Sequence, residues 1–195
     1  MRNNKVIKQL QKGFTLVELL IVVIILAILA AIVVPQFASS TDDAKVSSLD
    51  STLAAMRSAM ALYKQQHTLY PSAAASSGGG TACTTPGGAV GTGAADSEAA
   101  FLDQLAYYSN AAGQTCTHRG AANEFPFGPY IQKREIPSNA ITSSKALATI
   151  LTTGVLGMVS TATPVGLGWK YDNKTGQFIA DDANTDANGV EYYKH

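Results

Sequence analysis

The feature that most constrains this chain is a long apolar run near its start. From Phe14 to Val34 only Thr15 and Glu18 have polar side chains. A helix of that length measures about 31 Å at 1.5 Å per residue, which matches the hydrocarbon core of a bilayer. A carboxylate near the start of such a helix costs on the order of 3 kcal/mol in lipid unless it finds a partner. The run therefore predicts a membrane helix in which Glu18 needs a counter-charge.

Charge is distributed unevenly along the 195 residues. Basic and acidic residues number 14 each, so the chain is formally neutral and gives no basis for nucleic-acid binding. The first thirteen residues contain no acidic side chain, and their basic ones are Arg2, Lys5, Lys8 and Lys12. Positive residues that precede the first span stay in the cytoplasm. Everything after Val34 is therefore expected on the outer side of the inner membrane.

The apolar segment can be used in three ways. A signal peptidase could cut near Ala38 and release an exported soluble binding protein. The segment could instead be a plain anchor in which Glu18 pairs with its own N-terminus or reaches the interface. A cut after Gly13 would keep the apolar run and make Phe14 the N-terminus, which places a cationic amine beside Glu18. That cut supplies the counter-charge that the carboxylate needs.

The residues Lys12–Leu20 (KGFTLVELL), with Pro35 after the apolar run, resemble the class III processing signal of type IV pilins and type II secretion pseudopilins. The resemblance implies that a prepilin peptidase cuts after Gly13 and methylates the new amine of Phe14. It also implies that Glu18 attracts the N-terminus of a neighbouring subunit during filament assembly. The resemblance is close as far as the end of the following helix and loose beyond it.

The same resemblance implies partners and a location. The chain would be a single-pass inner-membrane protein, with its N-terminus inside, until it polymerises with its own copies through Phe14–Val34. Lipid and a filament core both hide this segment from water, so one can replace the other. Inner-membrane machinery would assemble the filament, either as an extracellular pilus or as a periplasmic pseudopilus.

Two roles within this family remain open. One is a structural subunit of a type IV pilus, which serves adhesion, motility or DNA uptake. The alternative is a type II secretion pseudopilin, which forms a short periplasmic pseudopilus for protein export. A glycine-rich stretch at 71–95 favours the exposed surface of a pilin, whereas an acidic tail and the lack of a terminal disulfide favour the pseudopilin.

Residues 35–70 are predicted to form the second, amphipathic half of the same helix. Pro35 lacks a backbone donor and its ring collides with the carbonyl of Ala31, so a kink or local unwinding is expected there. Apolar residues then recur at spacings of three and four until about His67. The members of this stripe are Val46, Leu49, Leu53, Met56, Met60 and Tyr63. We expect the stripe to pack on the chain's own sheet rather than in a coiled coil.

A globular head is predicted from residues 71–195. Its first part, 71–95, is rich in Gly, Ala, Ser and Thr, cannot build a core, and predicts an exposed, mobile surface loop. Acidic and capping residues at Asp96–Glu98 then predict the start of a short helix that ends near Asn110.

The rest of the head is predicted to contain strands. Alternation over Leu167–Tyr171 and a turn at Asp172–Gly176 predict a hairpin with Gln177–Ala180. Val155–Ser160 is another strand candidate, and Lys145–Thr153 is ambiguous between helix and strand. The expected fold class is α+β, with a long N-terminal helix packed on a small antiparallel sheet, as in pilins.

The only two cysteines, Cys83 and Cys116, both fall on the expected outer side. Thiols are oxidised there, so the pair predicts one disulfide, worth about 4 kcal/mol in the chain-entropy model. Buried free thiols are the alternative. A metal site that includes His118 would lack a fourth ligand and a recognisable spacing.

The tail contains one candidate ligand site. Oxygen side chains occupy every second position, as in calcium loops, at Asp182, Asn184, Asp186 and Asn188. Resemblance to major pseudopilins, which hold calcium near the C-terminus, adds to this pattern, but no glutamate stands at the final position. A solvated polar loop without a cofactor is the main expectation, and structural calcium is the alternative.

No catalytic constellation is found in the sequence. The histidines His67, His118 and His195 are dispersed and belong to no triad or metal-binding run. The chain is therefore not expected to be an enzyme.

Overall fold

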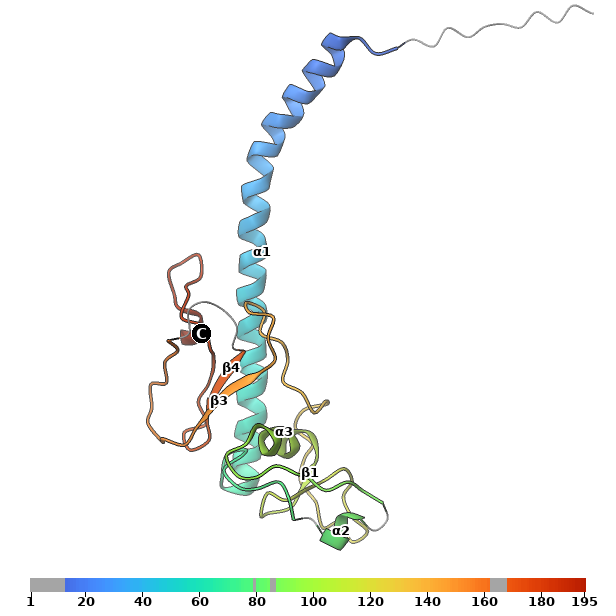
Figure 1. The fold of residues 1–195 in the computed structure, drawn as a ribbon, viewed down its shortest axis with the longest axis vertical. Coiled ribbons are helices and arrows are strands. Elements are labelled where there is room, and N and C mark those ends of the chain that lie inside the picture. The colour runs from blue at the N-terminus through green and yellow to red at the C-terminus, as the bar shows by residue number, and fades with distance from the viewer. Residues whose placement is uncertain (1–12, 79, 85–86, 162–167) are drawn as a thin grey trace, which may run out of the picture. The chain divides into compact units, whose positions relative to one another are not determined.

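The computed structural model describes residues 13–78, 80–84, 87–161 and 168–195. The chain divides into two compact units, Met1–Thr41 and Asp42–His195. Their boundary falls inside the first helix, α1 (Leu16–His67) (Figure 1). The predicted leader, up to residue 12, lies outside the described residues.

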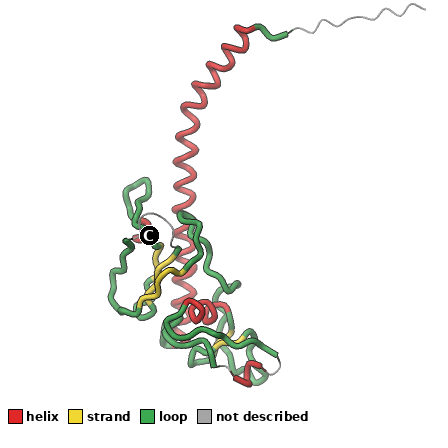
Figure 2. Tube along the Cα trace, in the orientation of Figure 1, coloured by secondary structure: helices red, strands yellow, loops and turns green. Residues whose placement is uncertain are grey.

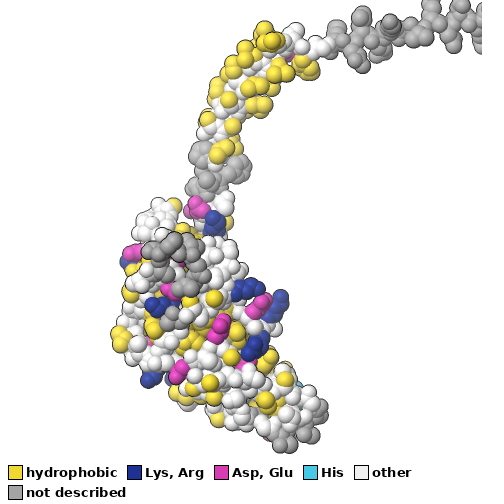
Figure 3. All heavy atoms as spheres, in the orientation of Figure 1, with side chains coloured by type: hydrophobic (Ala, Val, Ile, Leu, Met, Phe, Trp, Pro, Cys, Tyr) yellow, Lys and Arg dark blue, Asp and Glu magenta, His cyan; other side chains and the backbone are white. Residues whose placement is uncertain are grey.

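The described part of the first unit is the apolar half of α1, preceded by Gly13–Thr15, which have no regular secondary structure. The segment Leu16–Val34 is long and apolar enough to cross a bilayer. Its large apolar side chains range from 42% exposed at Val33 to 83% at Leu16, and Figure 3 shows them along this part of the helix. The helix does not end at Pro35, and the kink predicted there stays a prediction.

The second unit adds short elements to the other half of α1. The helices are α2 (Gly80–Thr84), α3 (Glu98–Ala106) and the 3-10 turn η1 (Tyr192–Lys194). The strands are β1 (Tyr108–Ser109), β2 (Thr115–Cys116), β3 (Leu147–Leu151), β4 (Trp169–Asp172) and β5 (Phe178–Ala180). Loops make up most of the unit outside α1 (Figure 2).

The amphipathic stripe of α1 is buried, as its periodicity predicts. Val46 is half-buried, and the other five predicted members are at most 2% exposed. They form one hydrophobic cluster with Phe101 of α3, Trp169 of β4 and Phe178 of β5. The helix therefore packs on the chain's own sheet rather than leaving the stripe free for another chain.

The head has the predicted α+β architecture, but its larger sheet is mixed. The strand order is β3-β4-β5, with β4 antiparallel to β5 across the predicted turn at Asp172–Gly176 and β3 parallel to β4. The smaller β1–β2 pair is antiparallel. Parallel neighbours need a connection of a dozen or more residues, and residues 152–168 provide it. The expectation of a purely antiparallel sheet is therefore wrong for β3.

Three segments of the head can be compared with their predictions. The short helix ends at Ala106, because Tyr107 is extended (φ −108°, ψ 172°) and β1 begins directly after it. The ambiguous segment Lys145–Thr153 contains strand β3. Val155–Ser160 is a loop rather than a strand. The predicted strand start at Leu167 lies outside the described residues.

The prediction of a wholly exposed loop at 71–95 is wrong. The segment contains α2, and its buried residues include Ser72, Ser76, Cys83, Gly91 and Gly93. Two polar side chains of α3 hold it in place. Gln104 accepts a hydrogen bond from the backbone N–H of Ser72 (2.6 Å) and donates to the carbonyl of Ala74 (3.0 Å). Small residues without an apolar pattern are thus packed through hydrogen bonds.

Asp103 is the second α3 side chain that holds this loop, and it is 1% exposed. Its Oδ2 accepts hydrogen bonds from Ser76 Oγ (2.7 Å) and from the N–H groups of Thr92 (3.0 Å) and Gly93 (3.3 Å). Its Oδ1 accepts from Arg134 Nε (2.5 Å). This hydrogen bond raises the pKa of Arg134 above its ordinary value. One buried carboxylate therefore joins α3, the glycine-rich segment and the chain near Arg134.

Replacing Asp103 with asparagine is expected to lower the free energy of unfolding by about 2–3 kcal/mol. The amide offers one acceptor where the carboxylate offers two, so buried N–H groups lose partners. Arg134 is 38% exposed, which keeps the loss below that of a fully buried ion pair. Urea denaturation of the full chain in detergent, followed by Trp169 fluorescence, measures it. Glu135→Gln, which makes the same charge change in the exposed Glu135–Lys145 pair, should leave the midpoint unchanged, and equal losses would contradict the prediction.

His67 lies buried near the C-terminal end of α1 and is 5% exposed. Its ring stacks on Tyr63 with 3.9 Å between centroids, and Phe127 and Tyr130 approach it edge-on. Nδ1 lies 3.0 Å from the carbonyl oxygen of Tyr63, and Nε2 lies 2.9 Å from Ser109 Oγ. Burial lowers the pKa of His67 below its ordinary value, and backbone hydrogen bonds only partly oppose this.

This lowered pKa predicts that the head loses stability in mild acid. Below about pH 6.5 the unfolded chain binds a proton at His67 that the folded chain does not. Stability from this group is therefore complete above about pH 6.5 and falls as the pH drops towards the folded pKa. We expect the urea midpoint of the wild type to fall between pH 7 and pH 5 more steeply than that of His67→Gln. Parallel slopes for the two proteins would refute this role.

Candidate functional site

The chain around the predicted cleavage point is exposed to solvent. Gly13 and Phe14 lie before the start of α1 without regular secondary structure, and Phe14 is 81% exposed. A Cβ added at Gly13 would meet no atom within 4 Å, and its φ lies outside the left-handed region. Neither packing nor backbone conformation therefore requires glycine here.

Glu18 takes part in a capping box at the start of α1. Its N–H donates to Thr15 Oγ1 (3.2 Å), while its Oε2 accepts from the N–H and the hydroxyl of Thr15 (both 3.4 Å). The sequence shows the signature of this motif as Thr15-Leu16-Val17-Glu18, and the sequence analysis missed it. These bonds are long, so they orient the carboxylate without using its full capacity to accept.

Glu18 lacks a charged partner within the part of the chain that the structure describes. No ion pair there includes Glu18. The carboxylate is exposed on the same helical segment as the apolar side chains that suit a bilayer. The need for a counter-charge, inferred from the sequence, is therefore not met by the described residues.

The two cysteines are joined in a disulfide, with an S–S distance of 2.11 Å. Cys83 of α2 and Cys116 of β2 are both fully buried and pack with Phe125 in a small second cluster. His118 lies nearby, but its Nδ1 accepts a hydrogen bond from the N–H of Gly120 (2.8 Å). These three side chains do not form a metal site, because the two sulfur atoms are joined in the disulfide and no thiolate remains as a ligand.

The predicted calcium residues lie in one loop, and the carboxylates among them accept hydrogen bonds from other residues of that loop. Asp182 Oδ1 accepts from the backbone N–H (2.8 Å) and the side-chain amide (2.7 Å) of Asn184. Asp186 Oδ1 accepts from the N–H groups of Asn188 (2.8 Å) and Val190 (2.9 Å), and these bonds lower the pKa of Asp186. Among these carboxylate oxygens only Asp182 Oδ2 is buried without a hydrogen-bond partner in the described chain.

Calcium needs six to eight oxygen ligands around it. Three of the six candidate side-chain oxygens accept hydrogen bonds within the loop, and no group of three or more His, Cys, Asp or Glu in the described residues is placed to hold a metal ion. Calcium binding therefore stays an untested prediction.

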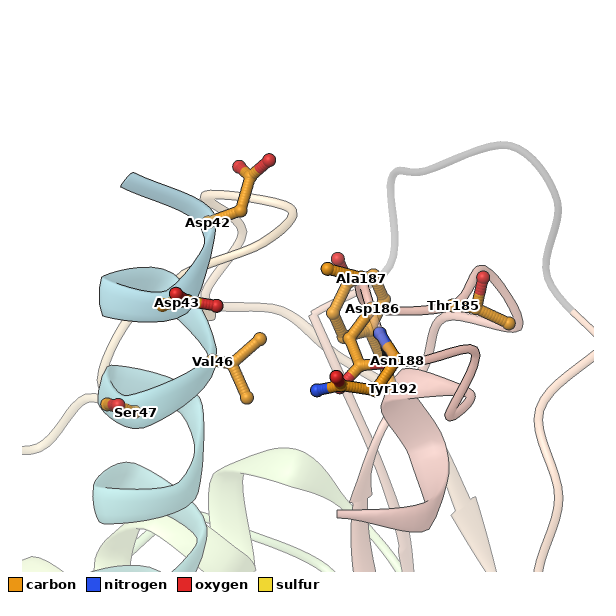
Figure 4. Close-up of a pocket in the computed structure, with 9 residues that line it drawn as sticks. All are labelled: Asp42, Asp43, Val46, Ser47, Thr185, Asp186, Ala187, Asn188 and Tyr192. Carbon is orange, nitrogen blue, oxygen red and sulfur yellow. Dashed lines mark hydrogen bonds between the residues drawn. The ribbon is translucent and has the colours of Figure 1, made fainter. Parts of the chain in front are cut away.

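A hollow of about 390 Å³ lies between this loop and α1. Figure 4 shows Val46 of α1 pointing across it towards the side of Tyr192 and Asp186. Its lining residues are Asp42, Asp43, Val46, Ser47, Thr185, Asp186, Ala187, Asn188 and Tyr192. Three of these residues, Asp42, Asp43 and Asp186, are acidic, so the hollow is acidic.

Comparison with known proteins bears on the N-terminal segment. Residues 8–34 match the family model described as the prokaryotic N-terminal methylation motif. This segment is similar to the N-terminal segment of type IV pilins and pseudopilins. The match covers the predicted cleavage point, Glu18 and the apolar run together. Such proteins are structural subunits rather than enzymes.

The curated relatives of this chain include both pilins and pseudopilins. Type II secretion system core protein G of Pseudomonas aeruginosa is 46% identical over 62 residues, which are 32% of this chain and 44% of the relative. Type IV narrow pilus major component PilA5 of Thermus thermophilus is 45% identical over 51 residues, 26% of this chain and 44% of the relative. Type II secretion system core protein G of Klebsiella michiganensis is 38% identical over 65 residues, which are 33% of this chain and 46% of the relative.

The chain spans less than half the length of these relatives, and about two thirds of it lies outside each match. No solved structure matches it. The similarity to pilins and pseudopilins therefore rests on the N-terminal segment, while the head is described by its own structure.

Proposed function

We propose that this chain is a structural subunit of a type IV pilus, matured by a prepilin peptidase that cuts after Gly13 and methylates the amine of Phe14. The observation that carries the proposal is the uncovered apolar half of α1, which follows directly on an exposed glycine and carries Glu18 in its first turn. No part of the described chain shields this segment. It is therefore built to be covered by lipid or by other copies of itself.

Assembly would exchange one apolar environment for another. In the inner membrane the segment Leu16–Val34 lies among lipid chains, with the head on the outer side. In a filament the same side chains pack against those of neighbouring copies. The exchange leaves the apolar area hidden from water at both stages, so the choice between them falls to polar interactions near the start of the helix.

Glu18 is the group that would direct this step. Cleavage after Gly13 creates an ammonium group on Phe14, and a neighbouring Glu18 can pair with it in a water-poor surrounding. The capping box holds the carboxylate in place through bonds of 3.4 Å, which are weak enough to be exchanged. The partners implied are the prepilin peptidase, the inner-membrane assembly machinery and further copies of this chain.

A type II secretion pseudopilin is the second candidate. Core protein G relatives from two organisms favour it, as does the lack of a disulfide near the C-terminus. The ordered glycine-rich segment, joined to β2 by the disulfide, supports a head that faces the outside of a pilus. Imaging of sheared cell surfaces decides between the two roles. Long fibres that contain the chain support a pilus. Polymer that stays bound to the cell, together with defective protein export when the chain is absent, supports a pseudopilus.

N-terminal sequencing and mass measurement of the mature protein test the maturation step. We expect methyl-phenylalanine at Phe14 and loss of the basic leader. A mature protein that begins at Ser39 or Ser40 would instead identify an exported soluble protein, and one that keeps Lys12 would exclude processing after Gly13.

A further inference from the structure

The connection between β3 and β4 carries an apolar tip on the surface of the head. Its three side chains are more exposed than is usual for large apolar residues, namely Val155 (68%), Leu156 (75%) and Val159 (50%). The fold does not use them in either hydrophobic cluster. We call these three residues the apolar tip.

The first end of this loop is fixed by a buried acceptor. Asp172 Oδ2 accepts hydrogen bonds from Thr153 Oγ1 (2.6 Å) and from the N–H of Gly154 (3.2 Å). Gly154 and Gly157 have φ angles of +70° and +86°, which other residues adopt with strain. Leu156 therefore lies between two glycines in the left-handed region.

The chain that follows Gly157 is also fixed by hydrogen bonds. The N–H of Met158 donates to Gln177 Oε1 (3.1 Å), and Lys170 Nζ donates to the carbonyl of Val159 (2.9 Å). Ser160 Oγ donates to Asp181 Oδ1 (2.6 Å), a carboxylate of a residue that is 4% exposed. The apolar tip is therefore held outward by specific bonds rather than left unpacked by a loose loop.

The sequence around the tip lacks charge. Residues 146–169 contain no Asp, Glu, Lys or Arg, although charged residues make up 14% of the chain. Charged residues are depleted at the centres of protein interfaces, where they would be desolvated. Within this range the exposed positions 152–157 and 159 therefore carry no charged side chain of their own.

A second uncharged surface lies on α1. The residues opposite the buried stripe are exposed and small, apart from Leu62, which is 46% exposed. We call this surface the outer face, and its members are Ala54, Ala55, Ser58, Ala61 and Leu62. Short side chains let another chain approach the helix closely, and the lack of charge matches the apolar tip.

We infer that the apolar tip of one copy packs on the outer face of α1 in a second copy. The inference rests on the proposed function, because three side chains bury far less than the roughly 1,000 Å² that a free-standing interface needs. Copies held side by side by their apolar helices reach an effective concentration of the order of millimolar, at which a small contact suffices. The two surfaces differ, so the contact is heterologous, which is the type of contact that an open filament uses.

Cross-linking in assembled polymers tests this contact. The double variant Leu156→Cys/Ala61→Cys should form a ladder of dimers, trimers and longer species on oxidation, because each chain carries both halves of the contact. The described residues contain no free cysteine that could compete. The matched control Ala121→Cys/Ala61→Cys, with the first cysteine on another exposed loop, should form no ladder. Absence of a ladder with the first pair, or dimers from Leu156→Cys alone, would overturn the inference.

Two further measurements keep the test independent of folding and of lipid. Leu156→Asp should reduce the sheared polymer at least tenfold with an unchanged thermal midpoint, whereas Ala121→Asp should not. Leu156→Cys should react with a membrane-impermeant maleimide before assembly and be protected in polymers. Protection before assembly would show contact with lipid and overturn the inference. Normal polymer from Leu156→Asp would refute this contact alone, while absence of polymer from the wild type would refute the proposed function.

Discussion

Replacing Glu18 with glutamine is expected to abolish polymer formation while membrane insertion and cleavage after Gly13 continue. The amide keeps the oxygen that Thr15 bonds in the capping box but cannot pair with an ammonium group. A charge left without its partner in lipid costs on the order of 3 kcal/mol, which corresponds to about a hundredfold weaker addition of each subunit. The amount of chain in sheared polymer, compared with the amount in membranes, measures the effect.

Two companion variants separate charge from helix capping. Thr15→Ala removes the hydroxyl of the capping box and should leave polymer formation near the wild-type level, since about 1 kcal/mol of cap is spread over a helix already stabilised by lipid. Glu18→Leu should behave like Glu18→Gln. Normal polymer from Glu18→Gln would refute the role of the charge, and equal failure of Thr15→Ala would assign the effect to helix capping.

Removal of the disulfide is expected to destabilise the head by about 4 kcal/mol. Cys83 and Cys116 are separated by 33 positions, and releasing a loop of that size increases the entropy of the unfolded chain. For a chain of this length the change corresponds to a fall in Tm of about 10 °C. Thermal unfolding of Cys83→Ala/Cys116→Ala in detergent, followed by Trp169 fluorescence, measures the shift.

Limited proteolysis shows where that stability is lost. Cleavage in the double variant should begin in the segments around α2 and β2, because Cys83 and Cys116 form the centre of their own small cluster. Wild-type protein treated with reductant provides the control without substitutions and should give the same cleavage pattern. Resistance to protease equal to that of the oxidised wild type would contradict the prediction.

The parts of the fold that sequence predicted well have dense apolar patterns. The stripe from Leu49 to Tyr63 repeats with the period of a helix, and it is buried throughout. The apolar run and the residues around Gly13 likewise form a continuous local motif, which the family match covers. In both cases neighbouring residues contain the whole signal.

The parts that sequence analysis missed depend on contacts distant along the chain. The glycine-rich segment is ordered by Asp103 and Gln104, whose acceptor roles no local pattern reveals. The parallel direction of β3 depends on how the chain returns through 152–168, and its apolar residues do not alternate. The capping box at Thr15 has a clear sequence signature. The prediction for Glu18 rested on the cost of a charge in lipid and did not include helix capping.

The two hydrophobic clusters of the head have no side chain in common. The larger one joins α1 to the sheet, whereas the smaller one surrounds the disulfide and Phe125. A substitution near the disulfide therefore has no shared packed side chain through which to disturb the face of α1 that the sheet covers. The side chains around Cys83 and Cys116 can thus change without altering the packing of α1 on the sheet.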